Sequence, residues 1–103
     1  MSVQLVYATF PDRDSLEAIA PALLEERLAA CFTCWEAGTQ YRWEDEIVAD
    51  EETLALFKTR PEHVDDLVAR LEDEHPYDVP CIVPLNGEDA NEAYADWIRA
   101  ETR

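Results

Sequence analysis

The chain has 103 residues and a formal net charge of -16, from 24 acidic and 8 basic residues, and 48% of its residues are hydrophobic. This length predicts a single domain over residues 1–103, and the hydrophobic share excludes a disordered acidic tail. The sign of the charge argues against nucleic acid and anionic membrane surfaces as partners, because phosphate groups are neutralised by clustered Lys and Arg.

The acidic excess also indicates the surroundings in which the protein works. So large a charge repels itself in dilute buffer, and salt relieves the repulsion because the Debye length falls to ~3 Å near 1 M. We interpret the acidic residues as the solvated surface of a halophile's protein, of the haloarchaeal type. No apolar run approaches the ~18 residues of a membrane span and no signal segment is visible, so a cytoplasmic location is expected. The odd number of cysteines, three, fits reduced thiols.

The first elements are a strand and a helix. Residues 3–9 are rich in β-branched and aromatic side chains, which predicts a buried strand. Leucine, isoleucine and alanine then recur at helical spacing over residues 16–28, with Asp14 or Ser15 as the expected N-cap. Pro21 lies within this segment but off its apolar stripe, so we expect a bend in one helix and not a break.

A long hairpin is predicted next. Residues 30–43 and 47–58 are extended segments, and the acidic residues 44–46 form the turn between them. Pro61 then opens a second helix, whose pattern buries residues 64–71 on one face.

The C-terminal part contains a strand and a last helix. Pro76 ends the preceding helix, residues 79–85 form a fourth strand at an edge or bulge because of their prolines, and Asn91 is the expected cap of the last helix. That helix is expected to present one apolar stripe, formed by Ala93, Tyr94, Trp97 and Ile98.

The predicted order is therefore β-α-β-β-α-β-α. With right-handed crossovers, this order gives an α+β fold of the ferredoxin-like βαββαβ type, with helices on one face of the sheet. The long hairpin and the last helix are additions to that fold.

Catalytic motifs are scarce. The two glycines, Gly38 and Gly87, lie too far apart for a phosphate-binding loop, and no hydrolase triad is visible. Cys31 and Cys34 resemble a redox pair, but on a strand residues three apart point to opposite faces. We therefore expect no enzyme.

Three residues suggest a metal site. His75, Asp78 and Cys81 combine imidazole, carboxylate and thiol within a short segment, and these groups are natural ligands of copper or zinc. The spacing matches no standard zinc pattern, so a structural histidine at the helix end is the alternative. His63 is expected on the surface. Lys58, the sole lysine, indicates either a specific ammonium contact or a stem packed on apolar surface.

The hairpin aromatics indicate a partner. Trp35, Tyr41 and Trp43 lie on strands too long for so small a domain to cover, so a second copy of the chain is expected against them. Packing of these rings against the domain's own helices is the alternative.

Several motifs in order resemble the CutA family of divalent-cation tolerance proteins. They are Tyr7-Ala8-Thr9-Phe10-Pro11-Asp12, Leu28-Ala29-Ala30-Cys31, Tyr41-Arg42-Trp43-Glu44, Lys58-Thr59-Arg60 and His75-Pro76-Tyr77-Asp78-Val79-Pro80. The resemblance implies a ferredoxin-like homotrimer linked to tolerance of copper and other divalent cations. It also implies a cleft between subunits, which in this chain would contain Cys31, Tyr41, Trp43, Lys58 and Tyr77 together with His75.

The chain departs from the family pattern at two positions. The hairpin turn has Asp45-Glu46 where Gly-Lys is usual, and Cys81 stands where a Glu is usual, which replaces a carboxylate by a softer ligand. The alternative function is a PII-like regulatory trimer, which would bind a small anion in the same cleft through Lys58.

Overall fold

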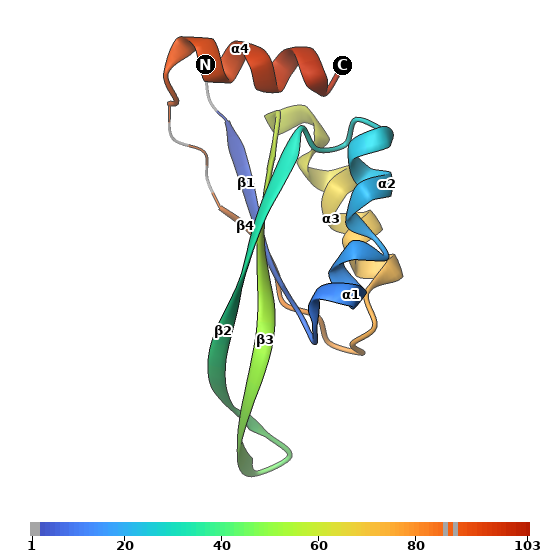
Figure 1. The fold of residues 1–103 in the computed structure, drawn as a ribbon, viewed down its shortest axis with the longest axis vertical. Helices are drawn as coiled ribbons and strands as arrows, with labels where there is room; N and C mark the ends of the chain where they lie inside the picture. The colour runs from blue at the N-terminus through green and yellow to red at the C-terminus, as the bar shows by residue number, and fades with distance from the viewer. Residues whose placement is uncertain (1–2, 86, 88) are drawn as a thin grey trace.

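The computed structural model describes residues 3–85, 87 and 89–103. Along the chain the elements are β1 (Gln4–Phe10), α1 (Arg13–Glu17), α2 (Ala20–Glu25), β2 (Cys31–Trp43), β3 (Glu46–Thr59), a 3₁₀ turn (Pro61–His63), α3 (Val64–Glu74), β4 (Ile82–Leu85) and α4 (Glu92–Glu101), as Figure 1 shows. The predicted order of strands and helices is confirmed, apart from a division of the first helix. Pro61 begins a 3₁₀ turn ahead of α3 where the start of the helix itself was predicted, and the fourth strand covers Ile82–Leu85 where residues 79–85 were predicted.

The four strands form one antiparallel sheet in the order β2-β3-β1-β4. In each βαβ unit, one other strand therefore lies between the two strands that the helices connect, which is the topology of the predicted ferredoxin-like α+β fold. The register places Val6 opposite Phe57 and Cys34 opposite Ala55. Since side chains alternate along a strand, one face of the sheet carries these apolar residues toward α1, α2 and α3.

The prediction of one bent helix over residues 16–28 was wrong. Helix α1 ends at Glu17 and α2 starts at Ala20, with Pro21 in its first turn. Proline is tolerated there because the amide that it lacks would have had no partner within the helix. The N-cap is Asp12, whose carboxylate accepts a hydrogen bond from the Ser15 amide at 2.8 Å, and neither Asp14 nor Ser15.

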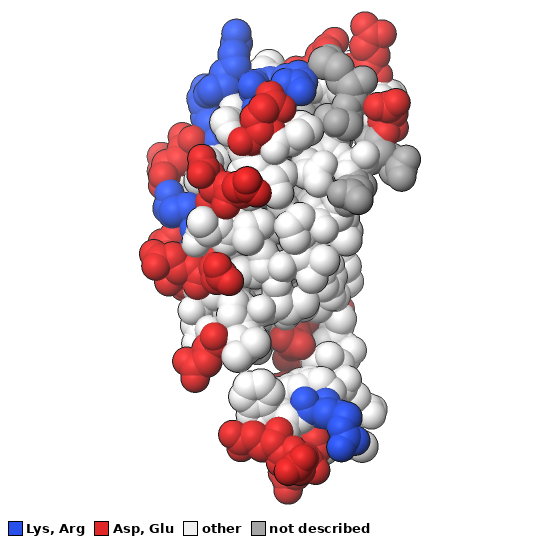
Figure 2. Space-filling view, turned by 180° about the vertical axis from the view of Figure 1, so that it is seen from behind, with Lys and Arg blue, Asp and Glu red and all other residues white. Residues whose placement is uncertain are grey.

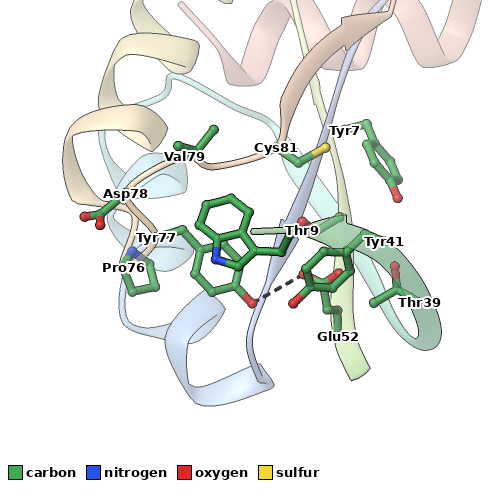
Figure 3. Close-up of a pocket in the computed structure, with 11 residues that line it drawn as sticks. Tyr7, Thr9, Thr39, Tyr41, Glu52, Pro76, Tyr77, Asp78, Val79 and Cys81 are labelled. Carbon is green, nitrogen blue, oxygen red and sulfur yellow. Dashed lines mark hydrogen bonds between the residues drawn. The ribbon is translucent and has the colours of Figure 1, made fainter. Parts of the chain in front are cut away.

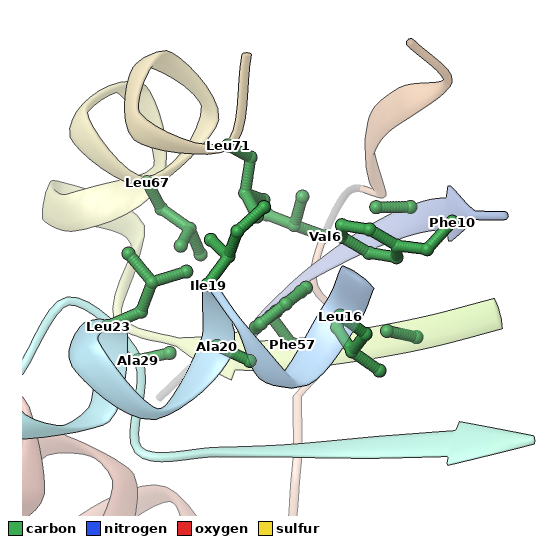
Figure 4. Close-up of a cluster of buried hydrophobic side chains, with 12 residues drawn as sticks. Val6, Phe10, Leu16, Ile19, Ala20, Leu23, Ala29, Phe57, Leu67 and Leu71 are labelled. Atoms are coloured by element: carbon green, nitrogen blue, oxygen red, sulfur yellow. The ribbon is translucent and has the colours of Figure 1, made fainter. Parts of the chain in front are cut away.

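Two hydrophobic clusters hold the layers together. The larger one joins the helix-facing side of the sheet to α1, α2 and α3, and Figure 4 shows side chains of these helices meeting those of β1 and β3. Each fully buried Leu or Phe in it contributes roughly 1.5–3 kcal/mol. The smaller cluster packs Ala95 and Ile98 of α4 against Val3, with Leu5 and Cys31 beside them. Helix α4 therefore covers one end of the opposite sheet face.

The hairpin of β2 and β3 extends beyond the helices, as Figure 1 shows, and accounts for the elongated shape of 45 × 24 × 21 Å. Its strands have 13 and 14 residues. The turn residues Glu44 and Asp45 both have positive φ, 48° and 65°, the combination that fits the twist of a two-residue hairpin.

Three predictions about α4 and the residues that contact its C-terminal end need correction. In α4, Trp97 is 43% exposed and Ala93 is exposed, while Ala95 and Ile98 are buried. The buried stripe of α4 is thus displaced from the predicted one, because α4 packs on the sheet end. His63 is not a free surface side chain: it is partly buried, and its Nε2 forms a hydrogen bond with the Thr102 carbonyl oxygen at 2.5 Å. Asn91 occupies the N-cap position but makes no capping bond with its side chain.

On the face of the molecule that Figure 2 shows, charged side chains lie mainly at the margins. Figure 2 shows acidic residues along one side and at both ends of this view, with a broad uncharged area between them. Several arginines form ion pairs, among them Arg99 with Glu62 at 3.1 Å and Arg13 with Glu17 at 3.1 Å. Within the described part of the chain, no helix is long and apolar enough to cross a membrane.

Candidate functional site: a groove beneath the hairpin

A groove of about 660 Å³ lies between the hairpin and the segment that follows α3. Strand β1 contributes Tyr7 and Thr9 to its lining, and β3 contributes Glu52. Strand β2 contributes Thr39, Tyr41 and Trp43, and the segment between α3 and β4 contributes Pro76, Tyr77, Asp78, Val79 and Cys81. Figure 3 shows Tyr7, Tyr41 and Tyr77 around this space, with Asp78 and Val79 at its other side.

The alternation of the strands explains why these residues meet. Tyr7 and Thr9 are two apart on β1, and the three β2 residues are also spaced by two, so each set lies on one face of its strand. This is the face opposite to α1, α2 and α3, because the intervening residues, such as Ala8 and Phe10, belong to the helix-facing cluster. The chain leaving α3 then reaches the side of β1, where the Cys81 carbonyl oxygen accepts a hydrogen bond from the Thr9 amide, and it closes one side of the groove.

Two phenol groups in the groove, those of Tyr77 and Tyr7, have a raised pKa. The Tyr77 hydroxyl donates a hydrogen bond to Glu52 Oε2 at 3.4 Å, drawn as a dashed line in Figure 3. Burial, followed by the negative charge of Glu52, raises the pKa of Tyr77 to about 12. The pKa of Tyr7 is raised by burial and, to a lesser degree, by Cys81 and Glu52. The charged residues in the lining, Glu52 and Asp78, are both acidic.

His75 lies next to the groove but is not part of its lining. Its side chain is only 8% exposed. Nε2 contacts the Thr9 carbonyl oxygen at 2.7 Å, and Nδ1 accepts a hydrogen bond from the Tyr77 amide at 3.1 Å. The ring also stacks on Phe10 with 4.7 Å between centroids. Both ring nitrogens therefore contact backbone groups. These contacts agree with the alternative prediction of a structural histidine at the end of the helix.

The three predicted metal ligands are not brought together. Asp78 and Cys81 line the same groove, whereas the nitrogens of His75 are occupied by backbone groups. Among the residues that the structure describes, no three His, Cys, Asp or Glu side chains are grouped so that they could hold a metal ion. The predicted residues thus do not fit a metal site formed within one chain.

The five predicted cleft residues fall into two groups. Tyr41, Trp43 and Tyr77 line the groove. Cys31 and Lys58 pair across the strands at the other end of the hairpin. Tyr41 is the tenth residue after Cys31 on β2, so the two residues are roughly 33 Å apart along the strand. One small ligand on a single chain cannot contact both groups.

The Cys31 end has contacts of its own. Lys58 Nζ donates a hydrogen bond to the Thr33 hydroxyl, so this lysine does make the specific ammonium contact. The Cys31 sulfur lies 3.6 Å from the Tyr94 hydroxyl. Burial raises the pKa of Tyr94 to about 12, and the contact with Cys31 adds to the shift.

The cysteines behave as predicted for a strand. Cys31 and Cys34 are both free thiols. Cys34 packs in the cluster beneath α1, α2 and α3, while Cys31 packs beside α4. They therefore lie on opposite faces of the sheet, and the redox-pair interpretation fails for the reason that strand alternation gave.

Sequence reasoning missed several lining residues, among them Tyr7, Thr9, Thr39 and Glu52. The period-two pattern placed Tyr7 and Thr9 on one face and Thr39 on the same face as Tyr41. The pattern does not show where residues 76–81 lie relative to β1, because their position depends on tertiary packing.

The fold and groove define a class of protein: a small α+β protein with a four-stranded antiparallel sheet and a projecting hairpin. The family model "CutA1 divalent ion tolerance protein" matches residues 4–101. The chain is 42% identical over 99 residues to the divalent-cation tolerance protein CutA of Pyrococcus horikoshii, covering 96% of this chain and 97% of that protein.

Solved structures of CutA proteins agree with this family match. The crystal structure of CutA1 from Pyrococcus horikoshii superimposes with a TM-score of 0.93 at 41% identity, covering 97% of this chain and 98% of that one. The periplasmic divalent cation tolerance protein CutA from Archaeoglobus fulgidus gives 0.94 at 31% identity, covering 98% and 99%. The chain belongs to the CutA1 divalent ion tolerance protein family.

Proposed function

We propose that this chain forms a homotrimer that binds copper or similar divalent cations directly, without catalysing a reaction, in a cytoplasm of high salt. The observation that carries the proposal is the family match over residues 4–101, since the relatives are named for divalent-cation tolerance. Because one family model matches residues 4–101, the match also supports a single domain. The PII-like alternative receives no support from these matches.

An apolar face of the sheet supports the homotrimer. On the face opposite to α1, α2 and α3, Trp35, Val83 and Leu85 are 42%, 44% and 39% exposed. Leu54 and Leu56 lie between them on β3 and are only partly buried. A contiguous apolar surface of this kind on a small protein is typical of an interface, and copies of one chain form closed symmetric assemblies.

The assembly is tested by light scattering coupled to size exclusion in molar KCl. A trimer has three times the mass of the 11.8 kDa chain. Val83→Arg and Leu85→Arg should give smaller species, while Glu72→Arg on the outer side of α3 should leave the mass unchanged. A wild-type mass of one or two chains would contradict the trimer.

Direct cation binding is supported by the donor atoms that the groove presents. Glu52 and Asp78 supply carboxylate oxygens and Cys81 an exposed thiol, which together suit a borderline or soft cation better than magnesium. Within the part of one chain that the structure describes, no three such groups are assembled, so the proposal draws on ligands from more than one chain of the trimer.

The test is a copper(II) titration by calorimetry in molar KCl with excess magnesium. A saturable stoichiometric site that is lost in Asp78→Asn and Cys81→Ser, but kept in Cys34→Ser beneath the helices, would support direct binding. Weak, unsaturable heats in all of these proteins would contradict it. Magnesium competition is essential, because 24 acidic residues attract divalent ions without a specific site.

The high-salt proposal has a separate test. If the acidic surface repels itself in dilute buffer, the urea midpoint should rise steeply with KCl and far less with an equal osmolality of sucrose. Equal effects of both would contradict adaptation to salt. Location is independent of this test: fractionation of the native cells distinguishes the cytoplasm from the periplasmic location named for the Archaeoglobus relative.

A further inference from the structure

We propose that α4 is a strap that opens separately from the rest of the domain, and that the side chain of Arg60 is the latch that holds the C-terminal end of this strap closed. The proposal goes beyond the divalent-cation function, because it concerns a movement of the fold and needs no ligand. Three observations support it: the small apolar contact beneath α4, the unequal attachment of its two ends, and the cationic side chains on its last carbonyl groups.

Helix α4 has little apolar contact with the rest of the domain. It lies across one end of the sheet, as Figure 1 shows, and of its ten residues only Ala95 and Ile98 are buried. Among the described residues, the cluster that they form with Val3 contains three buried residues, against twelve in the cluster beneath α1, α2 and α3. A helix of ten residues is not stable alone in water, so α4 depends on its docking contacts. Opening of the strap would uncover Val3 and Leu5 at the end of the sheet.

The two ends of α4 are held differently. At the start of the helix, Asn91 makes no capping bond with its side chain. The last carbonyl groups of a helix have no partner within the helix and carry partial negative charge, so they attract cations. Arg60 meets this need: its Nη2 donates to the Arg99 carbonyl oxygen at 2.5 Å, and its Nε donates to the Thr102 hydroxyl at 3.0 Å.

Arg60 is the most enclosed of the arginines that contact the end of α4. Its side chain is 18% exposed, whereas that of Arg27, which donates to the Glu101 carbonyl oxygen at 3.2 Å, is 53% exposed. His63 adds a contact with the Thr102 carbonyl oxygen. Because Arg60 lies between the end of β3 and the 3₁₀ turn, it connects α4 directly to a central strand of the sheet.

The acceptors of the latch suit a concentrated salt solution. Glu62 pairs with Arg99 at 3.1 Å and with Arg60 at 3.7 Å, but its side chain is 55% exposed, so salt screens these attractions. The hydrogen bonds from Arg60 to the carbonyl and hydroxyl groups of α4 have neutral acceptors and are partly buried, so salt screens them far less. In molar KCl, the hydrogen bonds of Arg60 therefore hold the strap, and the ion pairs contribute little.

The first test is hydrogen exchange of the intact protein in 1 M KCl with increasing urea, followed by mass spectrometry. Peptides covering residues 92–101 report on α4, and peptides covering residues 4–10 report on β1. The opening free energy of α4 should be lower than that of β1 and should fall less steeply with urea, because local opening exposes less surface than unfolding of the whole domain.

Two results of this experiment would overturn the strap. Equal free energies and equal urea slopes for both peptides would mean that α4 opens only when the whole domain unfolds. Exchange of α4 that slows as the chain concentration rises would mean that α4 is released by dissociation of copies of the chain, so it would belong to their interface.

Three variants test the latch. Arg60→Met keeps the apolar stem but removes the hydrogen-bond donors, and should speed the exchange of α4 by tenfold or more. Glu62→Gln removes only the exposed carboxylate and should speed it by less than about fivefold. Arg70→Met is the control, because it breaks ion pairs with Glu26 and Glu74 that remain intact when α4 opens, and it should change the exchange of α4 by less than about twofold.

Fast exchange of α4 in Arg60→Met, with no such change in the Arg70 control, would support the latch. An acceleration no larger than that of Glu62→Gln would overturn it. The wild-type comparison of α4 with β1 needs no substitution, so it decides whether the strap opens even if a variant fails to fold.

Discussion

Replacement of His75 by alanine should destabilise the protein in the absence of any metal. The imidazole is 8% exposed and joins three parts of the fold: Nε2 binds the Thr9 carbonyl, Nδ1 accepts from the Tyr77 amide, and the ring stacks on Phe10. Each hydrogen bond is worth about 1 kcal/mol net, and the stacking about 0.5–1.5 kcal/mol. The expected loss in unfolding free energy is therefore about 3 kcal/mol.

His75→Gln serves as the matched variant. Its amide can still donate to the Thr9 carbonyl, but it cannot stack on Phe10, so its loss should be about half that of the alanine variant. The measurement is urea unfolding followed by circular dichroism, with chelator present and at one fixed KCl and chain concentration, because unfolding of an oligomer depends on concentration. Asp78→Ala, an exposed neighbour, is the control and should stay within about 0.5 kcal/mol of wild type.

Two results would refute this reasoning. One is a His75→Ala protein with the wild-type midpoint in chelator. The other is a wild-type protein that loses stability on chelation until it matches the variant, because His75 would then act as a metal ligand.

Three further outcomes are expected. The unfolding free energy should fall as pH rises from 10 toward 12. Burial raises the Tyr77 pKa from 10.0 to about 12, so the stability that is fully present below pH 10 is lost as the phenol of the folded protein ionises. Tyr77→Phe should flatten this pH dependence in urea titrations. Asp45→Gly should stabilise by about 0.5–1 kcal/mol at neutral pH, because Asp45 has φ of 65°, and a thermal melt no higher than wild type would contradict it. Asp12→Ala should lower the urea midpoint at pH 7, because it removes the N-cap of α1. The capping hydrogen bond lowers the Asp12 pKa from 3.8, so the difference in midpoint between wild type and Asp12→Ala should shrink as pH falls below 3.8. Asp12→Asn, which keeps the cap, should show little change at pH 7.

The order of elements could be read from local patterns because each pattern reflects a short-range cause. Alternation along residues 3–9 and in the hairpin set the faces of the strands. Pro61 begins the 3₁₀ turn that leads into α3, and Pro76 comes directly after the C-cap of α3, both in keeping with the geometry of the proline ring. The same alternation predicts that Cys31 and Cys34 lie on opposite faces of the sheet, as they do. The family motifs depend on these local patterns as well.

The composition carried information about the surface but little about sites. An excess of acidic residues indicates repulsion that salt relieves, yet it cannot tell which carboxylate lies among aromatic rings. Glu52 looked like its neighbours in the sequence, and only its position opposite Tyr77 distinguishes it.

Tertiary structure decided the rest, because each remaining question depended on segments far apart in the chain. Pro21 starts a new helix, since residues on both sides of the break pack on one sheet face. His75 is a structural residue because the Thr9 carbonyl, 66 residues away, takes one of its nitrogens. The sequence by itself determined the strands, their faces and the family. The placement of residues 76–81 beside β1, which hydrophobic spacing does not encode, decided which of those residues share a groove.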